Sequence, residues 1–303
     1  MHRVFRRASI LVPFLRSSRI VPSSTSWCTL RAPECRSERV QRLAGLATLT
    51  SSHFDPELIA ALRGGQEIAL LTGAGVSAES GVPTFRDALT GLWRNFDAEL
   101  LATSEAFKRD PDLVWGWYEW RRSKVLAAQP NDAHLAIAHL AKLVPRLSLF
   151  TQNVDDLHER AGSADVQHLH GSLQDPRCFD CGHPFSFPRD AAQMSDDGRR
   201  LAPPVCEECG GLVRPGVVWF NELLPEKILA RADELFRSCD LLIVVGTSGL
   251  VYPVAELPNV AKKAGRKIIQ INSCKSNLDS LCTWNLMGTA GSLLPELVSR
   301  AFS

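Results

Sequence analysis

The chain has 303 residues, of which 45% are hydrophobic, so it can bury a sizeable core as one large domain or two modest ones. Its net charge is only +1 and is unevenly spread, because residues 1–52 hold nine Arg, no Lys and two acidic residues, a charge of +7 that leaves the remainder with −6. A nearly neutral body argues against nucleic-acid binding, and the lack of a run of about 18 apolar residues argues against a membrane span, so neither partner is expected.

Residues 1–52 are rich in Arg and Ser and contain no acidic residue before Glu34. Their apolar run ILVPFL is too short to span a bilayer and is interrupted by Pro13. This composition is typical of a mitochondrial transit peptide, so we predict a disordered targeting segment and a location in the mitochondrial matrix. The alternative is a plain disordered tail or an over-extended start site, with the protein in the cytoplasm.

The body of the protein is expected to begin near residue 53. A capping carboxylate at Asp55, followed by a proline and a glutamate, predicts the start of a helix that ends near Gly64. The segment 67–72 is apolar in its middle and predicts a short buried strand. This strand would run directly into a glycine-rich turn.

That turn, Gly73-Ala-Gly75-Val-Ser-Ala78, fits the loose dinucleotide pattern G-x-G-x-x-G/A. Backbone N–H groups in such a turn can face a pyrophosphate, and a bare structural turn is the alternative. A hydride-transferring dehydrogenase would also need an acidic residue about twenty positions on, at the end of a second strand, and the sequence there is not typical of a strand end. NAD binding without hydride transfer is therefore predicted, with Asn272 as a candidate for binding a ribose hydroxyl.

Residues 96–135 have a helical pattern and are crowded with aromatic residues at 114–120. Tyr118 and Arg121 are three positions apart, so they are neighbours on one face of the predicted helix. Taken alone, such a pair is more often a surface stack or an ion pair within the protein.

The second predicted strand, 146–153, ends in polar residues, and a short helix is expected over 154–162. Gln152, Asn153 and Asp155 stand at this strand exit, and His170 follows Asp155 by fifteen residues. A lone histidine is more often structural than catalytic. Near an amide-rich strand end, however, His170 is well placed to act as a general base at neutral pH.

Four of the nine cysteines form two C-x2-C pairs, Cys178/Cys181 and Cys206/Cys209, with 24 residues between the pairs. Two thiolate pairs on tight turns can close a tetrahedral site that leaves no position open for catalysis, so one structural Zn²⁺ is predicted. A redox dithiol would need only one pair, and two chance pairs of buried cysteines are the remaining alternative. The odd cysteine count, without a secretory signal, argues against a disulfide framework.

Two further apolar strands are predicted at 240–248 and 267–273. Continuous apolar strands separated by helical patterns indicate a parallel sheet covered on both faces, and each strand ends in small or polar residues, where open α/β sheets bind ligands. The predicted fold class is α/β, with a Rossmann-like parallel sheet and a smaller inserted domain. The sheet would be built from residues 53–95, 136–177 and 212–303, and the inserted domain from a helical module, 96–135, and a zinc-ribbon-like module, 178–211.

Several segments together resemble the sirtuin family of NAD-dependent protein deacylases, in the family's motif order and over residues 53–303. They are GAGVSAESGVPTFRD at 73–87, TQNVDDLH at 151–158, HLHGS at 168–172, the paired C-x2-C, VVWFNE at 217–222 and VVGTS at 244–248. The resemblance implies that NAD⁺ is a co-substrate from which nicotinamide is cleaved. In the implied mechanism the acyl-lysine amide oxygen attacks C1′ of the nicotinamide ribose, and His170 removes a proton from the ribose diol. Water then completes the release of lysine and 2′-O-acyl-ADP-ribose.

By the same resemblance, Phe85 would shield the reactive anomeric carbon from water, and Asn153 and Asp155 would orient the ribose and the carboxamide. The residues that the resemblance assigns to the cofactor are Gly73, Ala74, Gly75, Ser77, Ala78, Phe85, Arg86, Gln152, Asn153, Asp155, Gly246, Thr247, Ser248, Asn272 and Ala290. The partners it implies are proteins that carry acylated lysines, and the enzyme itself is expected to be a monomer.

The segments 217–225 and 246–253 resemble those between which the family holds its substrate as an added strand. Val218, Trp219 and Phe220 are the substrate-binding residues this implies. Without the resemblance, the run from 217 to 219 is more typical of a buried strand.

Tyr118 and Arg121 match the Y-x-x-R signature of the class III, desuccinylase-like branch of the family, and Ala98 matches a small residue of that branch. The resemblance therefore implies a deacylase that removes succinyl, malonyl or glutaryl groups, with acetyl as a secondary substrate. The alternatives are a protein that is mainly a deacetylase, a protein mono-ADP-ribosyltransferase, and a non-catalytic NAD-sensing zinc module.

Overall fold

The computed structural model describes residues 54–82, 97–187 and 198–303. The predicted transit peptide lies outside these residues, as do Phe85 and Arg86. In the described part of the chain, no helix is both long enough and apolar enough to cross a membrane.

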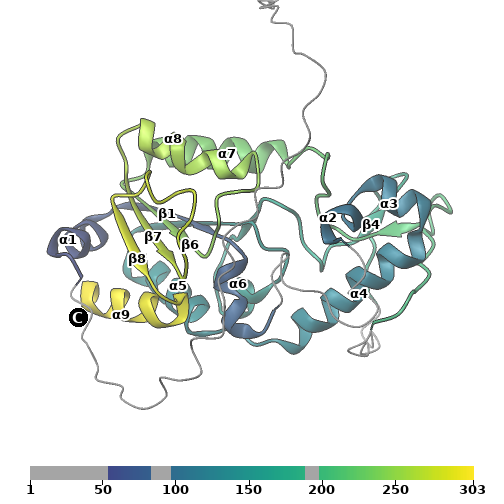
Figure 1. Cartoon of the computed structure of the whole chain (residues 1–303), viewed down its shortest axis with the longest axis horizontal. Coiled ribbons are helices and arrows are strands. Elements are labelled where there is room, and N and C mark those ends of the chain that lie inside the picture. The colour runs from purple at the N-terminus through teal and green to yellow at the C-terminus, as the bar shows by residue number, and fades with distance from the viewer. Residues whose placement is uncertain (1–53, 83–96, 188–197) are drawn as a thin grey trace, which may run out of the picture. The chain divides into compact units, whose positions relative to one another are not determined.

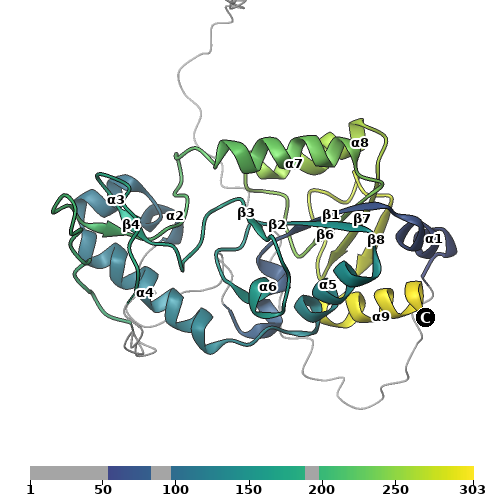
Figure 2. The same ribbon diagram turned by 180° about the vertical axis from the view of Figure 1, so that it is seen from behind.

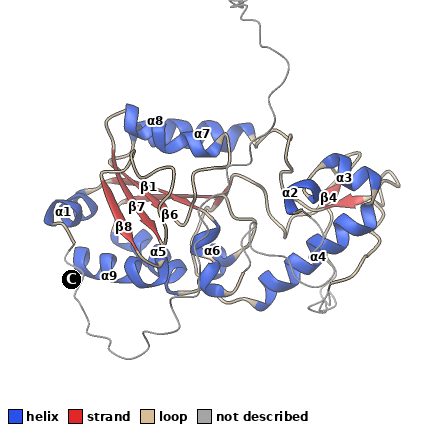
Figure 3. Cartoon of the chain, viewed as in Figure 1, coloured by secondary structure: helices blue, strands red, loops and turns tan. Residues whose placement is uncertain are grey.

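The centre of the fold is a parallel sheet of six strands (Figure 3). Its order is β3-β2-β1-β6-β7-β8, and β3 lies at the edge next to β2 (Figure 2). The strands are β1 (Glu67–Thr72), β2 (Arg146–Thr151), β3 (Gln167–His168), β6 (Leu241–Val245), β7 (Lys267–Asn272) and β8 (Trp284–Met287). Because Thr72 of β1 is level with Thr151 of β2 and Val245 of β6, the strands end along one line.

Helices cover both faces of the sheet (Figure 1). One face carries α1 (Pro56–Gly64), α5 (Asp132–Leu143) and α9 (Ala290–Phe302), and the other carries α7 (Glu226–Ser238) and α8 (Leu257–Lys263). Alternate residues of β1 pack into the two helical layers. Ile68 and Leu70 pack with α1 and α5, while Ala69 and Leu71 pack with α7 and α8. This explains the uninterrupted apolar strands, because side chains on both faces of the sheet are buried.

The local signals in the sequence are confirmed at α1. The Asp55 side chain accepts a hydrogen bond from the Glu57 backbone N–H (2.8 Å), and Pro56 opens the helix. The predicted strands at 67–72, 146–153, 240–248 and 267–273 correspond to β1, β2, β6 and β7, and the predicted helix over 154–162 contains α6 (Leu157–Arg160). The edge strands β3 and β8 were not predicted, because they are short and lack a continuous apolar run.

The inserted module is built from α2 (Ala98–Leu101), α3 (Ser104–Arg109) and α4 (Pro111–Ala127), and from an antiparallel pair of two-residue strands, β4 (Arg177–Cys178) and β5 (Val213–Arg214). Aromatic side chains dominate its core; they include Phe107, Trp117, Tyr118, Trp120 and Trp219. The helix α5 differs from the expected boundary at residue 135. It begins at Asp132 and buries Ala133 and Ile137 against the sheet, because its apolar stripe matches that face.

Candidate active site

The glycine-rich turn forms two short 3₁₀ turns over Ala74–Val76 and Ala78–Ser80. The Gly73 N–H donates to the Val245 carbonyl (2.9 Å) and the Gly75 N–H donates to the Gly246 carbonyl (2.8 Å). A Cβ on Gly75 would lie 2.7 Å from the Gly246 Cα. Glycine at these two positions therefore allows the turn after β1 to contact the turn after β6. The Gly73 and Gly75 N–H groups donate hydrogen bonds to that second turn, which differs from the expectation that they face a pyrophosphate.

Ser77, Asn153 and Asp155 form one buried hydrogen-bond network, which joins the β1 turn to the exit of β2. The Ser77 hydroxyl donates to Asp155 Oδ2 (3.0 Å) and accepts from Asn153 Nδ2 (3.0 Å). Burial raises the pKa of Asp155, although hydrogen bonds from the Leu157 N–H and the Ser77 hydroxyl oppose this. Ser77 is thus brought together with Asn153 and Asp155, which follow it by 76 and 78 residues, in a fixed arrangement.

Two buried histidines support this network, and sequence reasoning missed them. His134 Nε2 lies 3.4 Å from Ser77 Oγ, and His158 Nε2 lies 3.0 Å from Thr72 Oγ1. Their rings pack edge to face with centroids 4.8 Å apart. Burial lowers the pKa of His134 to about 4 and that of His158 to about 3, so both are neutral at pH 7. The only signal in the sequence is Asn131 three residues before His134, since the two form a capping box at the start of α5.

The end of β2 holds His170 in one orientation and tautomer. Its Nδ1 lies 3.0 Å from the Gln152 carbonyl oxygen, and because a carbonyl only accepts, Nδ1 carries the proton and Nε2 holds the lone pair. Burial lowers the pKa of His170, with partial opposition from the hydrogen bond to Gln152. Gly171 follows with φ +73°, and a Cβ there would lie 2.2 Å from the Gly216 carbonyl oxygen. Glycine therefore allows the His170 segment to lie directly against the 216–218 segment.

The remaining predicted cofactor residues lie along the same strand ends. Gln152 Nε2 donates to Thr247 Oγ1 (2.9 Å), and Asn272 Nδ2 donates to the Thr247 carbonyl (2.9 Å). Ala290 is the buried first residue of α9, and Ser248 follows Thr247 in the β6 turn. The Asn272 side chain, a candidate for the ribose hydroxyl, thus already bonds to the β6 turn through its amide N–H.

The predicted substrate residues come from the inserted module and the 217–220 segment. The Val218 N–H donates to the His170 carbonyl (2.8 Å), and the Trp219 indole N–H donates to the Tyr118 hydroxyl (3.1 Å). The Arg121 guanidinium lies over the Trp117 ring, 5.3 Å from its centroid. Ala98 is buried in α2, and Phe220 is exposed. The chain therefore connects His170, the predicted general base, to the aromatic core of the module through the 217–219 segment.

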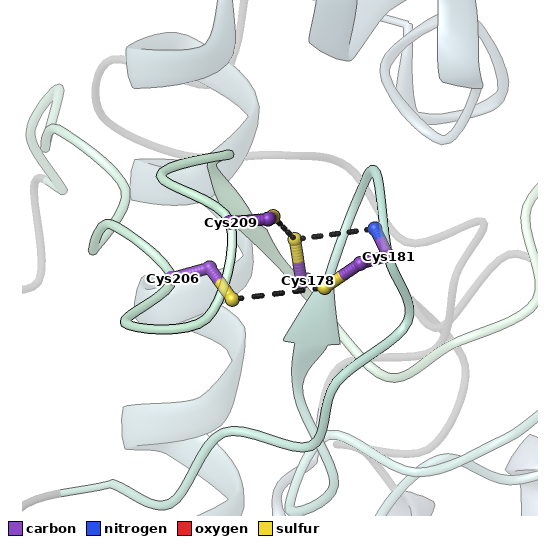
Figure 4. Close-up of side chains that lie close together, drawn as sticks. All are labelled: Cys178, Cys181, Cys206 and Cys209. Carbon is purple, nitrogen blue, oxygen red and sulfur yellow. Dashed lines mark hydrogen bonds between the residues drawn. The ribbon is translucent and has the colours of Figure 1, made fainter.

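The four predicted zinc ligands, Cys178, Cys181, Cys206 and Cys209, form one cluster (Figure 4). Their sulfur atoms all lie within 4.8 Å of one another. Hydrogen bonds from the N–H groups of Cys181 and Asp180 help to lower the pKa of the Cys178 thiol to about 6, while hydrogen bonds to the Cys178 sulfur help to raise the pKa of Cys181 and Cys209, so the cluster favours one thiolate, at Cys178. Four sulfur ligands, with no further His, Cys, Asp or Glu in the cluster among the described residues, fit a structural Zn²⁺ rather than a catalytic one.

An open parallel sheet that gathers polar side chains at the carboxyl ends of its strands is the architecture of Rossmann-type nucleotide-binding proteins, and this chain has that fold. Comparison with known proteins then gives the family. The model of the Sir2 family matches residues 73–253, and the chain belongs to this family. The sirtuin resemblance inferred from the sequence motifs is thereby confirmed.

Two bacterial relatives illustrate the similarity. The NAD-dependent protein deacylase of Methylococcus capsulatus is 54% identical over 245 residues, which cover 81% of this chain and 96% of the relative. The NAD-dependent protein deacylase 1 of Pseudomonas aeruginosa is 54% identical over 244 residues, which cover 80% and 96%.

Solved structures show the same fold. A Sir2 homologue in complex with NAD is 46% identical, with a TM-score of 0.75 over 82% of this chain and 94% of that one. A Sir2 complex with a p53 peptide and NAD⁺ is 30% identical, with a TM-score of 0.66 over 81% and 97%.

Proposed function

We propose that this protein is an NAD⁺-dependent protein-lysine deacylase that prefers acidic acyl groups, namely succinyl, malonyl or glutaryl, and uses acetyl-lysine as a secondary substrate. Its products would be the free lysine, nicotinamide and 2′-O-acyl-ADP-ribose. The names of the bacterial relatives and the Sir2 complexes with NAD and with a peptide support the reaction class. The observation that carries the proposal is the hydrogen bond from His170 Nδ1 to the Gln152 carbonyl, because it leaves Nε2 as a neutral base beside the Ser77–Asn153–Asp155 network.

NAD⁺ would supply an activated glycosidic bond whose cleavage releases nicotinamide. His170 Nε2 would accept the proton of a ribose hydroxyl, and such a positioned base contributes roughly 10²–10⁴-fold to a rate. Its lowered pKa keeps the ring neutral, and so able to accept a proton, at pH 7. Asn153 and Asp155, held by Ser77, would orient the ribose and the carboxamide without having to rearrange.

The acyl preference rests on the chemistry of α4. Arg121 offers a planar guanidinium that suits a carboxylate, and Tyr118 offers a hydroxyl donor. Hydrogen bonds to charged groups contribute about 1.5–3 kcal/mol each, enough to favour an acidic tail over a methyl group. Burial of Tyr118 and the half-buried position of Arg121 would strengthen both interactions.

The reaction is tested with NAD⁺ and two peptides that differ only in a succinyl or an acetyl group on one lysine. We expect mass spectrometry to show loss of the succinyl group together with one nicotinamide per peptide. A gain of one ADP-ribose on the peptide or the protein would instead identify a mono-ADP-ribosyltransferase. A folded, zinc-loaded protein that releases no nicotinamide would refute the proposal.

The acyl preference is tested with Arg121→Met. We expect this variant to lower kcat/KM for the succinyl peptide by roughly 10- to 100-fold, the size of one or two charged hydrogen bonds, and to change the acetyl reaction far less. The matched control is Arg109→Met, which removes an exposed arginine from α3 of the same module. Equal losses on the two peptides would contradict the assignment of Arg121.

The role of His170 is tested with His170→Ala. We expect kcat to fall by roughly 10²–10⁴-fold while NAD⁺ binding, measured by calorimetry, is retained, because the cofactor contacts lie on other residues. The control is His139→Ala, which removes an exposed histidine on α5. A His170→Ala enzyme with near-normal kcat would exclude His170 as the base.

The mitochondrial location remains a proposal, supported by the charge of +7 and the Arg- and Ser-rich composition of residues 1–52. A fluorescent fusion of the full chain should enter mitochondria, and a fusion that lacks residues 1–52 should not. A full-length fusion that stays in the cytoplasm would contradict this. We also expect a monomer, which sedimentation velocity would check.

A further inference from the structure

The core of the inserted module contains a buried hydrogen bond between two large aromatic side chains. The Trp219 indole Nε1 lies 3.1 Å from the Tyr118 hydroxyl oxygen, and the two residues are 2% and 6% exposed. An indole N–H can only donate, so the direction of this bond is fixed and Tyr118 is the acceptor. The bond therefore sets the orientation of the Tyr118 hydroxyl.

The Tyr118 hydroxyl has one proton of its own to donate. Within residues 54–82, 97–187 and 198–303, no acceptor lies within hydrogen-bond distance of this proton. Burial raises the pKa of Tyr118, so the hydroxyl keeps its proton throughout the physiological range. Native proteins seldom leave a buried donor without a partner, and a ligand that brings an acceptor would satisfy this one.

Trp219 is itself held firmly. The Arg214 guanidinium lies 3.5 Å from the centroid of the Trp219 rings, and the Trp219 backbone N–H donates to Glu222 Oε2 (2.9 Å). Arg214 and Glu222 are joined by an ion pair, and the Phe107 ring packs against Trp219 with centroids 5.4 Å apart. These contacts fix the orientation of the indole ring, so its N–H remains directed at the Tyr118 hydroxyl.

The same segment leads to the general base. Val218, the residue before Trp219, donates its N–H to the His170 carbonyl (2.8 Å). The Tyr118 hydroxyl is therefore connected to His170 through one side-chain hydrogen bond, two adjacent residues and one backbone hydrogen bond. This arrangement fits a pocket in which the scissile end of an acylated lysine lies near His170 and the acyl tail extends toward α4.

We propose that Trp219 is a positioning residue for acyl selectivity: its indole N–H holds the Tyr118 hydroxyl so that the hydroxyl proton is donated to the carboxylate of an acidic acyl group. The inference rests on the proposed deacylase function and adds a residue to it. The Trp219 side chain is 2% exposed and its one polar group already bonds to Tyr118, so we assign it this positioning role, and the predicted contact of the 217–220 segment with the peptide would be made by its backbone. Without the indole donor, the hydroxyl can rotate and direct its proton elsewhere.

The test is a double-mutant cycle of Trp219→Phe and Tyr118→Phe, read as the ratio of kcat/KM for the succinyl peptide to kcat/KM for the acetyl peptide. Trp219→Phe should lower this ratio about fivefold, which corresponds to about 1 kcal/mol, mainly through a higher KM for the succinyl peptide. Tyr118→Phe should lower it further. In the Tyr118→Phe background, Trp219→Phe should have no further effect on the ratio, because the hydroxyl it orients is already gone.

Two controls separate positioning from packing. Phe107→Leu loosens the packing around Trp219 without removing the N–H, so it should lower stability and leave the ratio unchanged. If Trp219→Phe does not fold, replacement of Trp219 by benzothienylalanine keeps the ring size and exchanges the N–H for sulfur, and the same fivefold loss is expected.

The following results would overturn the inference. Equal losses on the two peptides, or effects of the two substitutions that multiply in the double variant, would show that Trp219 does not act through the Tyr118 hydroxyl. A wild-type enzyme that deacylates lysine but does not prefer the succinyl peptide would overturn both this inference and the proposed acyl preference. If the wild-type enzyme prefers the succinyl peptide and the Trp219→Phe variant shows the same ratio of succinyl to acetyl kcat/KM, only the role of Trp219 would be overturned.

Discussion

The sheet and the inserted module bury their interiors in different ways. The sheet is enclosed mainly by aliphatic side chains on both faces, with Phe150 and Phe236 packed on the side of α7, and the polar residues predicted for the site lie where the strands end. The module has a two-stranded sheet, a core of large aromatic rings, buried polar groups such as Arg214 and the Tyr118 hydroxyl, and a four-cysteine cluster. A unit this small cannot bury enough apolar surface by strand pairing alone, so rings, ion pairs and a metal take that role.

This difference between the sheet and the module indicates which region can change acyl selectivity without loss of the fold. Strands β1, β2 and β6 pair along five or six positions each and hold the cofactor edge rigid. In the module, single side-chain contacts set the position of the next side chain, as Trp219 does for Tyr118. We therefore expect substitutions in the sheet to change stability, and substitutions in the module to change which acyl group is used.

Of the predicted changes, removal of the metal should cause the largest loss of stability and activity, and the inserted module should unfold before the sheet. Structural zinc contributes about 10–16 kcal/mol in zinc-finger peptides, so chelation or Cys206→Ser should unfold the module and abolish nearly all deacylase activity. Trp115, Trp117, Trp120 and Trp219 lie in the module, so tryptophan fluorescence should shift before the far-ultraviolet circular dichroism of the sheet changes.

The control for this experiment is Cys282→Ala, which removes a thiol outside the cluster and should leave zinc content and fluorescence unchanged. Zinc content is measured by atomic emission. Fluorescence and circular dichroism that change together on chelation would show that the two regions unfold as one unit, which would contradict the separation drawn above.

A core substitution in the sheet should have the next largest effect. Ile243 of β6 is completely buried between α5, α9 and the neighbouring strands, so Ile243→Ala should lower the free energy of unfolding by about 2–5 kcal/mol. Urea denaturation measures this loss. The ratio of succinyl to acetyl activity should stay at its wild-type value, because Ile243 is not part of the module's core, and a changed ratio would show that the sheet also sets acyl selectivity.

Much of this difference between the regions could be predicted from the sequence. The strands β1, β6 and β7 are largely apolar, β2 contains the apolar pair Leu149 and Phe150 before its polar exit, and the helix start at Asp55 is a local signal, so the sequence predicts these elements without any tertiary contact. The four cysteines were predicted as one site because their spacing alone limits the geometry. These features depend on residues that are close together in the chain.

Features that depend on distant residues could not be predicted in the same way. Asn131 indicates that His134 takes part in a helix cap, but no neighbouring residue in the sequence indicates that His134 and His158 pack together behind Ser77 and Thr72. Likewise, Trp219 is 101 residues from the hydroxyl it binds, and only the folded chain shows that the two meet. The glycine pattern of the β1 turn predicts N–H groups that face a phosphate, whereas the N–H groups of Gly73 and Gly75 bond to the β6 segment, which follows more than 160 residues later.

The smallest predicted effect concerns pH and the buried histidine pair. The Thr72 hydroxyl donates to Thr151, so His158 must donate to Thr72 through Nε2, and no hydrogen-bond partner lies near Nδ1 among the described residues. Protonation would place a second N–H there, buried beside His134. The folded-state pKa of about 3 is far below the unfolded value near 6.5, so the unfolded chain binds a proton first as the pH falls.

Stability from His158 is therefore fully present above pH 6.5 and is lost as the pH falls from 6.5 toward 3, by about 1.4 kcal/mol per pH unit. His158→Gln keeps an amide donor for Thr72 but cannot take up a proton. The slope of unfolding free energy against pH, measured in urea between pH 6.5 and 5, should be shallower in this variant by about that amount. His139→Gln, on the exposed side of α5, controls for the loss of one histidine. A His158→Gln slope equal to that of the wild type would mean that His158 takes up its proton as readily in the folded protein as in the unfolded chain, and the buried pair would then carry a charge beside Thr72 and Ser77.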